Sequence, residues 1–164
     1  MIKENSKNKF LGGKLTILQQ REGFRAGHDS VLLASSIPAK KGDKCLELGI
    51  GTGVVSLCLM KRVSGLSVIG IDNDKDAIKL LKENISLNGF DDYISFIKGD
   101  LNGGSNKFKN LKRHSFDHIF SNPPFYDKGE IVLPKNKNKR NAYHSEKDFI
   151  NNWIKLSLTF VKSK

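Results

Sequence analysis

The sequence predicts an α/β fold in which a doubly wound, mainly parallel sheet carries helices on both faces. Two observations lead to this prediction. From Lys44 onward, short apolar runs of strand length alternate with longer segments whose apolar residues recur at helical spacing. A glycine-rich run, residues 49–53, follows the first of these strands and leads into a helix. Ligands of such sheets bind at this place, at the carboxyl ends of the strands.

Local patterns place each element of this part of the chain. The expected strands are residues 44–48, 67–71, 93–97 and 116–120. The expected helices are residues 54–62 and 73–88, and Gly89 is a suitable stop for the second. One apolar face of that second helix is formed by Ala77, Leu80, Leu81 and Ile85. Right-handed crossovers between successive parallel strands then fix most of the topology.

The carboxyl-terminal part is less regular. Residues 102–114 are polar and rich in lysine, so the crossover from the third to the fourth strand is expected to be irregular, with at most a short helix. A final helix follows the loop at residues 128–140, and Ser145 and Asp148 fit a capping box at its start. Its apolar face is formed by Phe149, Trp153, Leu156 and Phe160.

The amino-terminal part is expected to be an extension of the sheet domain. Residues 1–13 are expected to be loose, and Leu15 and Ile17 alternate with polar residues as in a short strand. Asp29 stands where the N-cap of a helix would be, and Pro38 keeps that helix short.

Length and composition indicate one domain, with residues 1–40 as the extension and residues 41–164 as a partial Rossmann-like core. The longest apolar run, Val54–Met60, is too short to cross a bilayer. The first residues, Met1–Lys9, are polar and lack the apolar stretch of a signal peptide. We therefore expect a soluble, cytoplasmic protein.

The sequence gives no sign of a metal site. Cys45 and Cys58 have no CxxC partner and no histidine cluster nearby, so both are expected to be small core residues of a reducing compartment. His118 and His144 are isolated, and neither is assigned to catalysis.

The net charge of +11, from 28 Lys and Arg against 17 Asp and Glu, favours a polyanionic partner such as RNA. The candidate contacts lie in one basic run that contains Lys135, Lys137, Lys139 and Arg140. A second interpretation stays open, because lysine at unconstrained surface positions is also what an AT-rich genome encodes.

The glycine loop predicts a cofactor site. It has the form Glu47-x-Gly49-x-Gly51-x-Gly53, and these glycines let the backbone approach a ligand closely. A dinucleotide site usually has the spacing GxGxxG with a pyrophosphate at the helix N-terminus. The GxGxG spacing and the acidic Glu47, which suits a cationic sulfonium, favour S-adenosylmethionine instead.

Acidic residues also end the second and third strands. Asp72 lies about twenty residues after the loop, where a carboxylate can accept hydrogen bonds from ribose hydroxyls. Asp100 can accept from an adenine amine, and the adjacent Asn73 and Leu101 complete the set of cofactor-side candidates. Asp72 has a structural alternative as the N-cap of the following helix, a role open to Asn73 or Asp74 as well.

The turn Asn122-Pro123-Pro124-Phe125 follows the fourth strand and predicts the chemistry. The amide oxygen of Asn122 and the carbonyl of Pro123 can accept the two N–H bonds of an exocyclic amine, while the prolines hold the turn rigid. Phe125, together with Tyr126, can stack on the ring that carries the amine. The alternative is an ordinary Asn-Pro turn.

On these residues the chain resembles a class I S-adenosylmethionine-dependent methyltransferase of the Asn-Pro-Pro-(Phe/Tyr) group. It is more closely similar to the bacterial tRNA(Val) adenine-N6 methyltransferase family. The resemblance includes Gly12-Gly13-Lys14-Leu15 through Gln19, Arg25, Gly27, Asp29 and Leu32-Leu33, then residues 47–53 and 116–126.

The resemblance implies a tRNA substrate, namely an anticodon-loop adenine that is splayed out and methylated at N6. It also implies that the amino-terminal stretch packs over the methionine end of the cofactor, which makes Gly27, His28 and Asp29 cofactor-side candidates. The alternative role of Asp29 as a helix cap stays open.

The chain departs from the resemblance at its carboxyl end. Such domains have seven strands, whereas four are expected here, and the strands after the last helix are expected to be missing. The fourth strand would then be an exposed edge. The other functions considered are a protein glutamine methyltransferase, an rRNA guanine-N2 methyltransferase and a non-catalytic remnant. The expected state is a monomer without metal or membrane contact.

Overall fold

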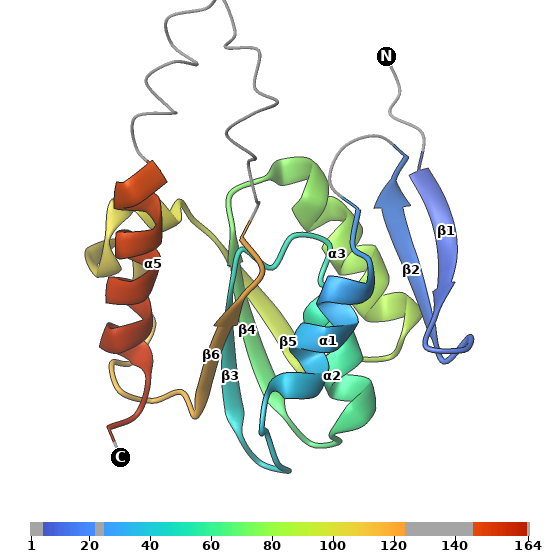
Figure 1. The fold of residues 1–164 in the computed structure, drawn as a ribbon, viewed down its shortest axis with the longest axis horizontal. Coiled ribbons are helices and arrows are strands. Elements are labelled where there is room, and N and C mark those ends of the chain that lie inside the picture. Colours follow the sequence, from blue (N-terminus) through green and yellow to red (C-terminus); the bar gives the residue numbers. More distant parts are fainter. Residues whose placement is uncertain (1–4, 22–24, 124–145, 164) are drawn as a thin grey trace, which may run out of the picture.

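A computed structural model describes residues 5–21, 25–123 and 146–163 of the chain. At its centre lies a parallel sheet with the strand order β5-β4-β3-β6 (Figure 1). The strands are β3 (Lys44–Leu48), β4 (Ser67–Asp72), β5 (Ile94–Lys98) and β6 (His118–Ser121). The predicted fold class, a Rossmann-like and mainly parallel sheet, is confirmed.

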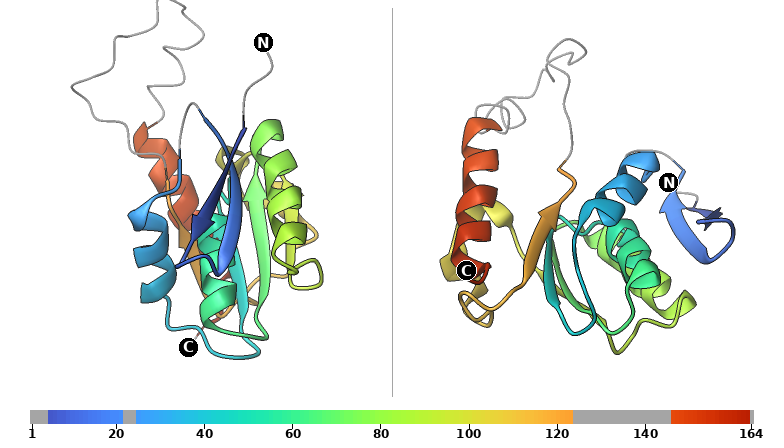
Figure 2. Two further views of the ribbon diagram at one scale, coloured as in Figure 1. Left: turned by 90° about the vertical axis from the view of Figure 1, so that its right-hand side faces the viewer. Right: turned by 60° about the horizontal axis from the view of Figure 1, so that its bottom comes forward.

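Helices cover both faces of this sheet (Figure 2). One face carries α1 (His28–Ser36), α2 (Val54–Arg62) and α3 (Lys75–Leu87). The other carries α5 (Glu146–Phe160) and two short 3-10 turns, η1 (Leu101–Gly103) and η2 (Ser105–Phe108). These turns form the irregular crossover that the polar composition of residues 102–114 predicts. Each face has its own apolar core, and Trp153, Leu156 and Phe160 belong to the one beneath α5.

The strand order places a switch point beside β3. The chain runs from β3 outward to β4 and β5, and then returns to the opposite side of β3 to form β6. Leu48 and Ser121 are partners in the parallel register, so β3 and β6 end side by side. The loops that follow these two strands therefore diverge from one point, which is where sheets of this kind bind ligands.

The amino-terminal segment forms a hairpin rather than a loose tail. β1 (Asn5–Phe10) pairs in antiparallel register with β2 (Leu15–Gln20). The expectation that residues 1–13 are loose is therefore wrong for Asn5–Phe10. The side chains of β1 are mostly polar, so the sequence shows no apolar alternation there. The strand forms because its backbone pairs with β2, whose Leu15 and Ile17 are buried.

Two asparagines hold this hairpin on the domain, namely Asn84 of α3 and Asn88, the C-cap of that helix. Asn84 accepts from the backbone N–H of Leu18 at 2.7 Å and donates to its carbonyl at 3.0 Å, while Asn88 bonds Thr16 in the same way. Asn84 also donates to the carbonyl of Thr52 at 2.9 Å. The hairpin and the glycine loop are thus fixed to one helix.

The ends of α3 settle which residue caps it. Asp74 is the N-cap, since its Oδ1 accepts from the backbone N–H of Asp76 at 2.8 Å and of Ala77 at 3.2 Å. The helix ends at Leu87, and Gly89 follows with φ +71°, as expected for a C-terminal stop.

β6 is an edge strand in the described part of the chain, and the segment after α5 pairs with Phe116, two residues before the strand begins. Val161 forms an isolated parallel bridge with Phe116, and Lys162 donates its N–H to the carbonyl of Phe116 at 2.9 Å. The segment after α5 therefore begins to pair with the chain just before β6, although no strand was expected after this helix. No helix among the described residues is long and apolar enough to cross a membrane.

Candidate active site

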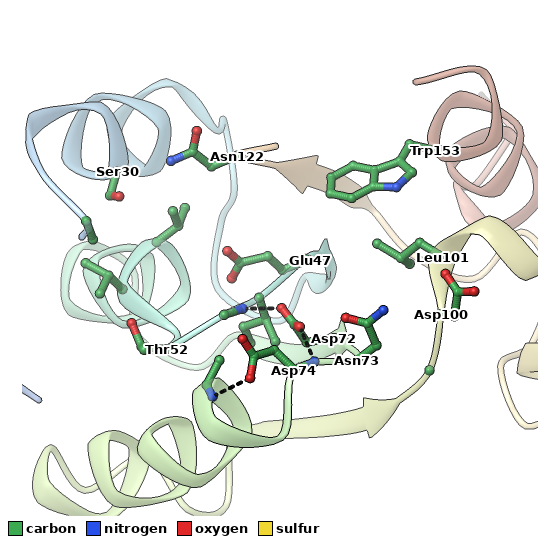
Figure 3. A pocket seen from close by; sticks show the side chains of 18 of the residues that line it. Ser30, Glu47, Thr52, Asp72, Asn73, Asp74, Asp100, Leu101, Asn122 and Trp153 are labelled. Atoms are coloured by element: carbon green, nitrogen blue, oxygen red, sulfur yellow. Dashed lines mark hydrogen bonds between the residues drawn. The ribbon is translucent and has the colours of Figure 1, made fainter. Parts of the chain in front are cut away.

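A cavity of about 360 Å³ opens at the switch point, above the carboxyl ends of the strands (Figure 3). Eight of the sequence-predicted site residues line it, namely Glu47, Gly49, Gly51, Asp72, Asn73, Asp100, Leu101 and Asn122. They come from four separate segments of the chain, so the cavity is a product of the sheet order. Its size falls in the range of small-molecule sites.

Other predicted residues lie elsewhere. Gly27, Asp29 and Gly53 do not line the cavity, and Pro123 lines a smaller groove between β6 and α5. The remaining candidates fall outside the described residues, and their roles stay predictions. These are Pro124, Phe125, Tyr126, Lys135, Lys137, Lys139 and Arg140.

The glycine loop connects β3 to α2 through left-handed backbone conformations. Gly53 is the N-cap of α2 with φ +85°, and a Cβ on it would lie 2.5 Å from a methyl group of Leu81. Gly49 has φ +73°, and a Cβ there would lie 2.8 Å from the indole of Trp153. Gly53 is thus required by packing, whereas Gly49 lets an aromatic ring approach the loop.

Asp72 holds the loop in place through its carboxylate. One oxygen accepts from the backbone N–H of Gly51 at 2.7 Å, and the other accepts from that of Asp74 at 2.9 Å (Figure 3). The alternative role of Asp72 as the helix cap is wrong, because Asp74 fills that position. Each carboxylate oxygen has a further lone pair, so Asp72 can still accept hydrogen bonds from a ligand.

Glu47 is a buried carboxyl group in the wall of the cavity. It is 1% exposed, and the hydroxyl of Ser56 donates to its Oε2. Burial raises the pKa of Glu47 to about 8, the Ser56 hydrogen bond lowers it in part, and the charge of Asp72 raises it. The position therefore favours the neutral acid until a positive charge comes near it.

Asp100 and Leu101 form one end of the cavity. Asp100 caps the η1 turn by accepting from the backbone N–H of Asn102 at 2.9 Å, and Lys107 lies 3.9 Å from its other oxygen. The next residue, Leu101, is buried. This end pairs an apolar wall with a carboxylate, a combination that suits a planar ring with an amine.

Asn122 meets Asp29 at the opposite end. The side-chain NH₂ of Asn122 donates to Oδ2 of Asp29 at 2.6 Å, and Oδ1 of Asp29 accepts from the backbone N–H of Gly27 at 3.1 Å. Gly27 is the N-cap of α1 and Asp29 lies in the first turn. The expectation that Asp29 is the N-cap is therefore wrong, since its carboxylate joins α1 to the end of β6.

Trp153 is the main residue that sequence reasoning missed. The sequence places it on the apolar face of the last helix, and it is indeed 9% exposed and packed in the core beneath α5. Its indole also points into the cavity beside Leu101 (Figure 3). Helical periodicity identifies a buried face but not the cavity that one of its side chains reaches, so the sequence carried no signal for this role.

The titratable groups His118, Cys45 and Cys58 do not line the cavity. His118 lies at the start of β6, and its Nε2 is 3.0 Å from Oδ2 of Asp43. Cys45 and Cys58 are buried thiols, and burial raises their pKa to about 12 and about 11. In residues 5–21, 25–123 and 146–163, no group of three His, Cys, Asp or Glu side chains is arranged to hold a metal ion.

The family model and the relatives that match this chain are all of methyltransferases. The family model of the methyltransferase small domain matches residues 24–136. A protein of Tolumonas auensis named tRNA1(Val) (adenine(37)-N6)-methyltransferase is 30% identical over 115 residues, which are 70% of this chain and 46% of that protein. A protein of Methanocaldococcus jannaschii, provisionally named a protein N5-glutamine methyltransferase, is 35% identical over 109 residues, which are 66% of this chain and 50% of that protein.

Among solved structures, P. horikoshii TYW2 in complex with MeSAdo has a TM-score of 0.63 at 19% identity. The match covers 96% of this chain and 48% of the other, and it supports the fold. This chain spans about half the length of the curated relatives that it matches.

Proposed function

This chain belongs to the methyltransferase small domain family, and on that premise we propose that it transfers a methyl group from S-adenosylmethionine to N6 of an adenine in tRNA. One observation carries the proposal. Asn122, whose amide oxygen can accept from an exocyclic amine, lies in the same cavity as the glycine loop and Asp72. A cofactor and a substrate amine bound at these two places would therefore lie next to each other.

The described residues fit this cofactor. Asp72 would accept hydrogen bonds from the ribose, and Leu101 with Asp100 would hold the adenine ring and its amine. Glu47 would face the positive charge of the sulfonium, which a carboxylate attracts. A pyrophosphate at the same place would be repelled by that carboxylate. When bound, the cofactor supplies an electrophilic methyl group, so the protein itself has mainly to position the acceptor nitrogen.

Asn122 would supply that positioning. Its amide oxygen would accept one N–H of the amine, and the carbonyl of Pro123 would accept the other. Both bonds favour a nitrogen whose lone pair is available, and the fixed φ of proline keeps the second acceptor in place.

tRNA is the substrate that the other observations favour. The T. auensis relative is named a tRNA adenine-N6 methyltransferase, and this chain carries a net charge of +11. A positive excess of this size attracts phosphate backbones. The basic run from Lys135 to Arg140 stays a candidate contact, and the expected cytoplasmic location and monomeric state stay predictions.

A protein glutamine side chain is the second candidate substrate. The M. jannaschii relative carries that provisional name, and a glutamine amide presents an NH₂ group that suits the same grip of Asn122. Both substrates would use the same cofactor residues.

Methyl transfer to defined acceptors tests the proposal. The purified 164-residue chain is incubated with radiolabelled S-adenosylmethionine and a tRNA(Val) transcript, and the digested nucleosides are analysed by mass spectrometry. We expect N6-methyladenosine, and a transcript with guanine in place of adenine 37 serves as the matched control. Label in a glutamine-containing protein instead of the transcript would favour the second candidate. Transfer to neither, by a chain that binds the cofactor, would contradict both.

A further inference from the structure

Asp29 and Asn122 are 93 residues apart in the sequence and are joined by a hydrogen bond beside the cavity that Asn122 lines. The carboxylate of Asp29 is fixed at both oxygens, since Oδ1 accepts from Gly27 and Oδ2 accepts from the amide nitrogen of Asn122. The second contact is 2.6 Å long, which is shorter than an ordinary N–H···O bond, as an ionised acceptor favours.

This contact fixes which way the amide of Asn122 is turned. An ionised carboxylate can only accept hydrogen bonds, so the amide must present its NH₂ group to Asp29. The hydrogen bond from Asn122 lowers the pKa of Asp29, and desolvation opposes it in part, so the carboxylate is ionised at neutral pH. The amide oxygen of Asn122 then lies on the other side of the group, and among the described residues no hydrogen bond to it is seen, so it can accept from a ligand.

We propose that Asp29 is a positioning residue that orients the amide of Asn122, so that its oxygen is presented to the N–H of the acceptor amine. This inference rests on the proposed function, because it assigns the oxygen of Asn122 to the substrate. Asp29 does not itself line the cavity, so it acts through Asn122. Hydrogen bonding of the amide NH₂ to a negative charge also polarises the amide and strengthens its oxygen as an acceptor.

Two other roles for Asp29 make different predictions. A residue that only anchors α1 to β6 would contribute to thermal stability without changing turnover of the folded chain. A residue that binds the cofactor would change cofactor affinity. A positioning residue changes turnover at saturating cofactor and leaves both cofactor affinity and the fold close to the wild type.

The experiment compares Asp29→Ala and Asp29→Asn with the wild type. Asp29→Ala removes the carboxylate, and we expect kcat to fall about 10- to 100-fold because misplaced reacting groups cost that much. Asp29→Asn keeps an acceptor oxygen without the charge, so it should recover part of the loss. The dissociation constant of S-adenosylhomocysteine, measured by calorimetry, should stay within about twofold. Ser35→Ala, an exposed change on the same helix, is the control.

A second readout does not require activity. The side-chain NH₂ resonances of Asn122, assigned by comparison with Asn122→Ala, should shift in Asp29→Ala and lie between the two in Asp29→Asn. Unchanged resonances, or an unchanged kcat in a folded Asp29→Ala variant, would overturn the inference. If the wild type transfers no methyl group to tRNA, the proposed function fails, and the resonances alone still decide whether Asp29 orients Asn122.

Discussion

The two sides of the cavity are built in opposite ways. Apart from Asp100 and Leu101, the predicted cofactor side is one segment, residues 47–74, in which the carboxylate of Asp72 bonds the backbone of Gly51 and Asp74. The transfer side joins Asp29 and Asn122, which only the docking of α1 against the end of β6 brings together. The first side is encoded by neighbouring residues, whereas the second depends on the whole fold.

The carboxyl groups of the two sides also have opposite electrostatics. Glu47 is buried with one hydroxyl partner, and burial raises its pKa to about 8. Asp29 is exposed and accepts hydrogen bonds, which lower its pKa. At neutral pH we therefore expect Glu47 to be largely neutral in the free chain and Asp29 to be charged.

The largest expected effect is a loss of turnover without a loss of cofactor affinity. Asn122→Ala should lower kcat by at least about 100-fold, because it removes an acceptor placed at the reacting group. Cofactor affinity should stay nearly unchanged, as measured by calorimetric titration with S-adenosylmethionine. A matching loss of affinity would mean that Asn122 belongs to the cofactor side, and the division into two sides would be wrong.

Asp72→Ala should have the complementary effect. It removes acceptors for the ribose and two hydrogen bonds to the loop backbone, so affinity for S-adenosylhomocysteine should fall about 10- to 100-fold. Calorimetry gives the affinity, and kcat at saturating cofactor should change much less. The control is Asp76→Ala, four residues later in the first turn of α3. Equal affinity in Asp72→Ala and the wild type would remove Asp72 from the cofactor side.

The pH dependence of stability tests the state of Glu47. Its pKa in the folded chain, about 8, is above the value of 4.5 for a free side chain, so the folded state holds a proton that the unfolded state has lost between these pH values. This contribution is complete below pH 4.5 and disappears as the pH rises through 8.

Glu47→Gln keeps the shape of the side chain and removes this titration. The free energy of unfolding of the wild type, relative to Glu47→Gln, should therefore decrease between pH 6 and pH 8, by up to about 1.4 kcal/mol per pH unit. Urea titrations at three pH values measure it. Parallel curves for the two proteins would show that Glu47 is already ionised in the folded chain.

The smallest expected effect concerns Trp153. It is the only tryptophan of the chain and its indole lines the cavity, so its fluorescence should change when the cofactor binds. Trp153→Phe keeps an aromatic ring of smaller area, and affinity for S-adenosylhomocysteine should fall about two- to tenfold. Emission that stays constant through saturation, with calorimetric binding present, would place Trp153 in the core alone.

Sequence periodicity located most of the sheet domain because its signals are local. The structure has β3 at Lys44–Leu48 and α2 at Val54–Arg62, the same limits that the sequence predicts. Alternation and helical spacing report which side chains are buried, and these elements are buried over most of their length. The same rule fails for β1, whose polar side chains carry no such pattern and whose conformation comes from pairing with β2.

The sequence by itself determined the fold class and predicted the residues of the cofactor side, since the loop glycines and the acids at the strand ends lie next to the elements that position them. Only the tertiary structure decided that Asp29 reaches Asn122 and that Trp153 faces the cavity instead of the core alone. The physical reason is that hydrogen bonds and packing between distant segments depend on strand order and helix docking, which no local pattern contains.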